Sequence, residues 1–259
     1  MQSTPPPTVS TANEAPEAAS ATPSKEEIWA TYALSYDAVL PSLDFYREVV
    51  DRHVDALAAD DVGTIIDIGA GTGSVAIPLL LSGRRVTCVD SSQAMLERLQ
   101  QKVPAEANDR VVVALCSAEN LSAWPDASFD GVNILLALFA MADQRAAFGH
   151  AMRVLRPGGV LVATEPKRCF DMKSLLAHAE QWLHSQGLYE RLHEHWQRVF
   201  AVNQIIDPRQ RLSAIAIEDI CSLLGGCGFQ IQSVRDSHHG NCATVVARKD
   251  ITGDVANDE

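Results

Sequence analysis

The sequence predicts an α/β fold built on a doubly wound, seven-stranded, mostly parallel sheet with one antiparallel edge strand. Short runs of β-branched and other apolar residues alternate with helical patterns between residues 64 and 164, as in a series of strand–helix–strand units. A glycine-rich turn directly follows the first of these runs. The last two runs, at residues 229–234 and 243–247, are joined by a short polar link, so they are expected to pair and supply the antiparallel edge.

The segment before the sheet has a helical pattern. Across residues 25–59, apolar residues recur at spacings of three and four. Pro41 divides the stretch into two helices, and Ser42 is expected to cap the second. Residues 25–60 are therefore expected to form a helical unit ahead of the sheet.

Seven apolar runs are expected to be the strands. They are residues 64–68, 85–89, 110–115, 131–136, 160–164, 229–234 and 243–247. Helices are expected between them at residues 73–81, 93–101, 143–155 and 217–224. Ser91 or Ser92 is expected to cap the second of these helices, and the turn at residues 156–159 (Arg-Pro-Gly-Gly) to end the third.

The rest of the chain is expected to add a cap and two tails. Residues 167–212, rich in Leu, His, Trp and Glu, predict a helical insertion after the fifth strand. Residues 1–24 are rich in Pro, Ala, Ser and Thr without apolar periodicity, which predicts a disordered tail. Residues 251–259 are expected to be a flexible C-terminal tail, so the domain is expected to span residues 25–250.

Composition narrows the class of partner. The formal net charge is −12, which disfavours nucleic acid and anionic membrane surfaces as partners. No apolar run approaches the roughly 20 residues of a membrane span, and the N-terminus lacks the features of a signal peptide. Six cysteines occur without a Cys-x-x-Cys pair, so we expect no metal site and a reducing, cytoplasmic setting.

The glycine turn and an acidic residue together predict a ribose-containing ligand. The first strand ends in Gly-Ala-Gly-Thr-Gly at residues 69–73, and glycines there let the backbone approach a ligand closely. Asp90 ends the second strand, at the spacing where a carboxylate meets ribose hydroxyls and can accept both of their protons. The alternatives are an ordinary tight turn for the glycines and a helix cap for Asp90.

Three segments, in matching order and spacing, resemble the class I S-adenosylmethionine-dependent methyltransferase family. Residues 65–73 (Ile-Ile-Asp-Ile-Gly-Ala-Gly-Thr-Gly) resemble its first motif. Residues 117–130 (Ser-Ala-Glu-Asn-Leu-Ser-Ala-Trp-Pro-Asp-Ala-Ser-Phe-Asp) resemble its Asp-Ala-Glu segment. Residues 155–159 (Leu-Arg-Pro-Gly-Gly) are similar to its turn before the fifth strand. The resemblance covers about residues 61–166.

The resemblance implies S-adenosylmethionine as cofactor and methyl transfer to a small or medium-sized organic acceptor. The residues that it places at the cofactor are Tyr36, Asp67, Gly69, Ala70, Gly71, Asp90, Ser91, Ser117, Ala118, Glu119 and Leu136. Asp67 and the glycines would lie along the methionine part, and Leu136 beneath it. Asp90 would hold the ribose, while Ala118 and Glu119 would border the adenine.

Two details of the resemblance affect cofactor binding. The family often has Asp at the position of Ser117, and Ser accepts a hydrogen bond more weakly than a carboxylate, so affinity is expected to be modest. Residues 32–37 (Tyr-Ala-Leu-Ser-Tyr-Asp) look like the lead-in that many small-molecule methyltransferases fold over the cofactor, which implies that residues 25–60 form a helical lid. Core packing is the alternative role of Tyr36.

A general base is needed only if the acceptor arrives protonated. The candidates are His178, His193, His238 and Glu165, because ligands of this fold collect at the carboxyl ends of the strands, where the insertion begins. The alternative is that the histidines are exposed, and that Glu165 binds backbone amides in its own turn.

Two other functions remain open from the sequence. A nicotinamide-dependent oxidoreductase would need a third glycine at the position of Ser74. A non-catalytic scaffold would bind S-adenosylmethionine without converting it, and the intact glycine turn does not distinguish it from an enzyme.

Overall fold

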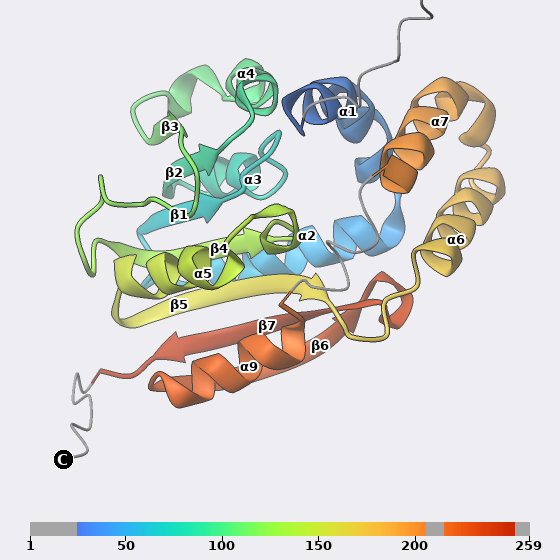
Figure 1. Ribbon diagram of the computed structural model, residues 1–259. Helices are drawn as coiled ribbons and strands as arrows, with labels where there is room; N and C mark the ends of the chain where they lie inside the picture. The colour runs from blue at the N-terminus through green and yellow to red at the C-terminus, as the bar shows by residue number, and fades with distance from the viewer. Residues whose placement is uncertain (1–24, 206–214, 252–259) are drawn as a thin grey trace, which may run out of the picture.

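The computed structural model describes residues 25–205 and 215–251, in which a seven-stranded sheet is flanked by helices (Figure 1). The strands are β1 (Thr64–Ile68), β2 (Arg85–Asp90), β3 (Val111–Leu115), β4 (Phe129–Leu135), β5 (Leu155–Pro166), β6 (Phe229–Ser237) and β7 (Cys242–Lys249). The α-helices are α1 (Lys25–Val39), α2 (Asp44–Leu57), α3 (Ala76–Leu81), α4 (Gln93–Lys102), α5 (Gln144–Val154), α6 (Met172–Ser185), α7 (Tyr189–Ile205) and α9 (Ile217–Gly226). Short 3-10 turns are η1 (Leu40–Ser42), η2 (Ala105–Ala107), η3 (Leu138–Ala140) and η4 (His238–Gly240).

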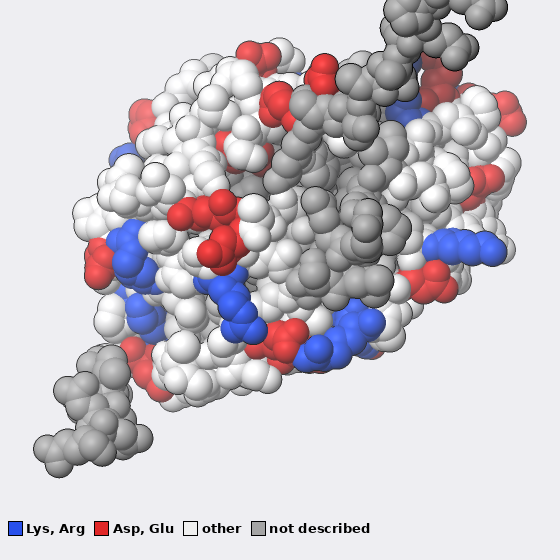
Figure 2. Space-filling view, viewed as in Figure 1, with Lys and Arg blue, Asp and Glu red and all other residues white. Residues whose placement is uncertain are grey.

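The predicted tail at residues 1–24 lies outside the described residues, as do the end of the predicted cap and most of the C-terminal tail. Among the described residues, no helix is both long and apolar enough to cross a membrane. On the face seen in Figure 2, lysines and arginines are interspersed with aspartates and glutamates rather than gathered together.

The sheet has the order β3-β2-β1-β4-β5-β7-β6. Strands β1 to β5 pair in parallel, which confirms the predicted mostly parallel sheet. The antiparallel strand is β7, which pairs with β5 on one side and with the outermost strand β6 on the other. The strand order reverses direction along the chain between β1 and β4, and ligands of such sheets bind beyond the carboxyl ends of the strands at that point.

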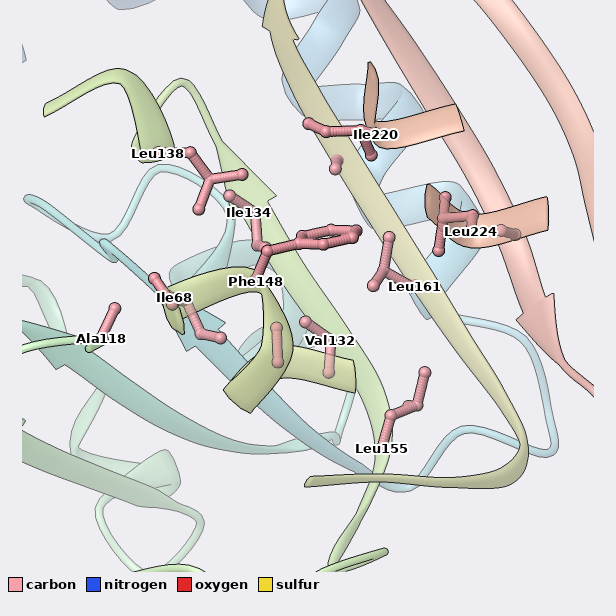
Figure 3. Close-up of a cluster of buried hydrophobic side chains, with 14 of the residues drawn as sticks. Ile68, Ala118, Val132, Ile134, Leu138, Phe148, Leu155, Leu161, Ile220 and Leu224 are labelled. Atoms are coloured by element: carbon pink, nitrogen blue, oxygen red, sulfur yellow. The ribbon is translucent and has the colours of Figure 1, made fainter. Parts of the chain in front are cut away.

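Apolar side chains cover both faces of the sheet. On one face, α5 and α9 pack against β4 and β5, and Figure 3 shows Phe148 of α5 lying beside Ile134 and Leu161. On the other face, α2 and α3 bury a second cluster that includes Leu57, Leu79 and Ile65. These two layers fix the strands and hence the loops that follow them.

The N-terminal helices and the insertion form a third apolar cluster of their own. Tyr32 of α1, Leu183 of α6 and Trp196 of α7 are buried together in it. In Figure 1, α1, α6 and α7 stand on the right, at the end of the sheet toward which β5 runs. The predicted helical insertion after the fifth strand is therefore present as α6 and α7.

Most predicted elements occur, with three corrections. Helix α3 begins at Ala76 rather than residue 73, because Gly73 adopts a left-handed conformation with φ +86°. Strand β5 begins at Leu155 rather than residue 160, because Leu155 pairs with Phe129 across an irregularity in the ladder. Ser42 does not cap α2, since the N-cap residue is Leu43 and makes no side-chain cap hydrogen bond.

The other predicted helix signals occur as expected. Pro41 lies in the 3-10 turn that separates α1 from α2. The Ser92 hydroxyl caps α4 by accepting a hydrogen bond from the Met95 backbone N–H at 3.4 Å.

Candidate functional site

A pocket opens beside the glycine turn, between the ends of β1, β2 and β4 and helix α1; we call it the glycine-loop pocket. It is lined by all but two of the residues that the sequence places at the cofactor. Those that line it are Tyr36, Gly69, Gly71, Asp90, Ser91, Ser117, Ala118, Glu119 and Leu136. The sheet topology thus gathers residues from five separate segments of the chain into one cavity.

Gly69 and Gly71, at the start of the turn, require glycine for different structural reasons. Gly69 has φ +70°, and a Cβ there would lie 2.4 Å from the Cβ of Ala137, so no other residue fits. Gly71 has φ +54°, and a Cβ there would meet only the Gly69 carbonyl oxygen, at 4.0 Å. The space above Gly71 is therefore open toward the pocket.

Asp90 links this turn to the start of α4. Its Oδ2 accepts a hydrogen bond from the Gly71 N–H at 2.8 Å, and its Oδ1 accepts one from the Ser92 N–H at 2.9 Å. Burial raises its pKa. Each carboxylate oxygen can accept more than one hydrogen bond, so Asp90 can hold the turn and still accept from ligand hydroxyls.

Asp67 and Ala70 do not line the pocket. Asp67 is buried, its Oδ1 accepts a hydrogen bond from the Asn133 side chain at 2.6 Å, and burial raises its pKa to about 7. Asn133 Oδ1 lies 2.5 Å from Nδ1 of His53, and Nε2 of His53 lies 2.7 Å from the Thr164 hydroxyl. Burial lowers the pKa of His53 to about 4, so its ring is neutral at pH 7 and satisfies both neighbours.

Sequence reasoning missed this series of hydrogen-bonded buried side chains, the buried polar chain, which runs from Asp67 to Thr164 on the face of the sheet that α2 covers. Its signals were an Asn in the middle of an otherwise apolar strand and a His on the apolar face of a helix. Each signal also fits other structures, so neither identifies the partner of the other.

Tyr36 stands at the boundary of the glycine-loop pocket. Its hydroxyl hydrogen-bonds to that of Tyr46, which in turn donates to the Ser74 hydroxyl at 3.0 Å. Burial raises the pKa of Tyr46 to about 12 and that of Tyr36 well above its ordinary value, so both hydroxyls stay protonated. The ring of Tyr32 contacts that of Tyr36 edge-on at 5.4 Å, as their spacing of four predicts.

Asp37 fastens α1 to the rest of the site. Its carboxylate accepts a hydrogen bond from the Thr72 hydroxyl of the glycine turn at 2.5 Å. It also forms ion pairs with Arg98 at 2.9 Å and Lys102 at 2.7 Å, both from α4. These contacts hold Tyr36 against the pocket.

A second pocket lies between α1, α2, α6, α7 and the β6–β7 link; we call it the cap pocket. Trp29, Tyr36 and Leu136 line both pockets, so the two cavities adjoin. Leu136 has φ +51°, a strained conformation for a residue with a side chain. The loop that contains it forms part of the wall between the pockets.

His238 lines the cap pocket, and the other candidate bases do not. It is 4% exposed, its Nδ1 lies 3.2 Å from the Ser237 hydroxyl, and burial lowers its pKa to about 4. His178 is exposed and stacks on His239 with ring centroids 4.5 Å apart. His193 is exposed and contacts Tyr189 edge-on at 5.3 Å.

Glu165 is fully buried and lines neither pocket. Its Oε1 accepts hydrogen bonds from the N–H groups of Ala137 at 3.0 Å and Leu138 at 2.8 Å. Its Oε2 has no hydrogen-bond partner among the described residues, and burial raises its pKa to about 7. Glu165 thus fixes the loop that follows Leu136.

Comparison with known proteins relates the sheet region of this chain to methyltransferases. The family described as "Methyltransferase domain" matches residues 66–163. A demethylmenaquinone methyltransferase of Clavibacter sepedonicus is 36% identical over 120 residues, which cover 46% of this chain and 46% of that protein. A 27-O-demethylrifamycin SV methyltransferase of Amycolatopsis mediterranei is 39% identical over 115 residues, which cover 44% of this chain and 42% of that protein. The chain thus spans about half the length of the curated relatives it matches.

Solved structures extend the likeness to the whole fold. A SAM-dependent methyltransferase from Aquifex aeolicus superposes with a TM-score of 0.57 at 15% identity, covering 86% of this chain and 99% of that one. The magnesium protoporphyrin IX methyltransferase of Synechocystis PCC 6803, solved with bound SAM, has a TM-score of 0.53 at 20% identity, covering 79% and 80%. Residues 66–163 thus match a methyltransferase domain, and the fold of the chain is similar to that of solved SAM-dependent methyltransferases.

Proposed function

We propose that this protein transfers a methyl group from S-adenosylmethionine to a small or medium-sized organic acceptor by in-line displacement. The observation that carries the proposal is that the glycine-loop pocket and the cap pocket adjoin at Trp29, Tyr36 and Leu136. A cofactor in the first pocket can present its methyl group to an acceptor in the second. Such alignment is the main contribution of a protein to this chemistry.

The residues of the glycine-loop pocket fit the cofactor. Asp90 offers carboxylate oxygens to the ribose hydroxyls, and the open space above Gly71 admits the methionine part. Ser117 and Glu119 lie at the end assigned to adenine. The Glu119 side chain also accepts hydrogen bonds from the N–H groups of Ala142 and Asp143 at 2.7 and 3.0 Å, which hold it in place at the pocket.

The cofactor supplies an activated methyl group on a positively charged sulfur. Trp29 and Tyr36 present aromatic rings at the junction, where a ring face can stabilise such a cation. Glu165 braces the loop that follows Leu136, and Leu136 lies where the two pockets adjoin. The roles of α1 and α2 as a lid and of α6 and α7 as a cap follow from this arrangement and are part of the proposal.

The relatives support a small organic acceptor. The two curated relatives described above are named for acting on demethylmenaquinone and on 27-O-demethylrifamycin SV. No disulfide joins the cysteines among the described residues, which supports a reducing, cytoplasmic location as part of the same proposal.

Turnover tests the proposal. The purified chain is incubated with S-adenosylmethionine and a panel of hydroxylated aromatic acceptors, and S-adenosylhomocysteine is quantified by mass spectrometry. We expect acceptor-dependent product from the wild type and none from Gly71→Val, in which a branched side chain occupies the open space. Cofactor binding without product across the panel would instead support a non-catalytic scaffold.

A further inference from the structure

The cap pocket has a lining without charged side chains. None of its described lining residues is Asp, Glu, Lys or Arg. Most are aromatic or aliphatic, among them Phe45, Phe139, Leu175 and Trp196. An ion that enters such a cavity loses its hydration shell and gains no opposite charge from a side chain of the described lining, so its entry is unfavourable.

Few polar groups face this cavity. Asn203 already donates its side-chain N–H to the Val199 carbonyl oxygen at 2.8 Å, and Tyr36 and Tyr46 bond to each other. Trp29 offers only a donor, its indole N–H, whereas His238 has its Nδ1 engaged by Ser237 and an Nε2 for which no hydrogen bond is present among the described residues. A hydroxyl group suits this nitrogen in either neutral tautomer, since a hydroxyl both donates and accepts.

We propose that the cap pocket takes a neutral, largely apolar acceptor whose hydroxyl group hydrogen-bonds to Nε2 of His238. The inference rests on the proposed function, because it names the class of molecule that the same site methylates. It disfavours amino acids, carboxylates, phosphates and ammonium compounds as acceptors. It assigns His238 to acceptor binding, while the exposed His178 and His193 have no part in it.

A series of naphthalene derivatives isolates the charge. Isothermal titration of the full chain saturated with S-adenosylhomocysteine compares 2-naphthol with 2-naphthoate and 2-naphthylmethylammonium, which share one ring system. We expect 2-naphthol to bind at least about tenfold more tightly than either ion, because each ion would be desolvated without a partner. Equal or weaker binding of 2-naphthol would overturn the proposal.

A matched pair of variants isolates the hydrogen bond. His238 and His239 are neighbours in the same turn with φ +50° and +53°, conformations that Asn tolerates, but only His238 lines the pocket. We expect His238→Asn to weaken 2-naphthol binding about fivefold and His239→Asn to leave it unchanged. Equal effects of the two changes would contradict the role of His238.

Titration with S-adenosylhomocysteine distinguishes a wrong acceptor class from a wrong proposed function. If the wild type and both variants bind it but the naphthyl series shows no discrimination, the acceptor class is wrong and the proposed function stands. If the folded wild type does not bind it, the proposed function itself fails.

Discussion

Replacing Asp90 by Asn tests the assignment of the glycine-loop pocket most specifically. Asn has nearly the same shape but only one acceptor oxygen, whereas Asp90 holds the Gly71 and Ser92 N–H groups with separate oxygens. The side-chain amide of the variant must then face one backbone donor with a donor of its own. The negative charge that would strengthen hydrogen bonds from the ribose hydroxyls is also lost.

The expected magnitude follows from these bonds. A hydrogen bond to a charged group contributes about 1.5–3 kcal/mol, which corresponds to a roughly 10- to 150-fold higher Kd for S-adenosylhomocysteine. The backbone N–H left without an acceptor should also lower the free energy of unfolding by about 1–3 kcal/mol.

Calorimetry at pH 8, together with urea denaturation, measures both quantities. Asp109→Asn is the matched control. Asp109 is 74% exposed and lies before the amino end of β3, whereas the pocket lies beyond the carboxyl ends of the strands. We expect that control to bind like the wild type. Wild-type affinity in a folded Asp90→Asn protein would refute the ribose assignment.

The remaining predictions concern the glycine turn and two buried titratable groups. Gly71→Val should abolish cofactor binding and cost roughly 1–3 kcal/mol of stability, because φ is +54° there, and normal calorimetric binding by this variant would disprove the loop assignment. Because the pKa of His53 is lowered from 6.5 to about 4 in the fold, the wild type should lose about 3 kcal/mol more than His53→Gln in urea denaturation as pH falls from 6.5 to 4; parallel pH curves would contradict this. The pKa of Glu165 is raised from 4.5 to about 7, so its effect has the opposite sign: stability is full below pH 4.5, and the wild type should lose about 3 kcal/mol more than Glu165→Gln as pH rises to 7.

The fold and the glycine-loop pocket could be predicted because their determinants are local. A β-branched run followed by Gly-Ala-Gly specifies a strand and a turn within ten residues, and Asp90 ends the next strand in the same pattern. Parallel pairing then brings both segments to one edge of the sheet whatever the other elements do.

The cap pocket and the buried polar chain depend on contacts between distant segments. His53 meets Asn133 and Thr164 only because α2 packs against β4 and β5. His238 is distinguished from His178 by burial alone, and burial depends on how the β6–β7 link meets α2 and α6. Periodicity within one segment carries none of this information.

The glycine-loop pocket is proposed to bind S-adenosylmethionine. Isothermal titration of the purified chain with S-adenosylmethionine, S-adenosylhomocysteine and NAD tests it directly. We expect saturable one-to-one binding of the two adenosyl compounds and no binding of NAD. Binding of NAD in place of the adenosyl compounds, or no adenosyl binding by a demonstrably folded protein, would contradict it.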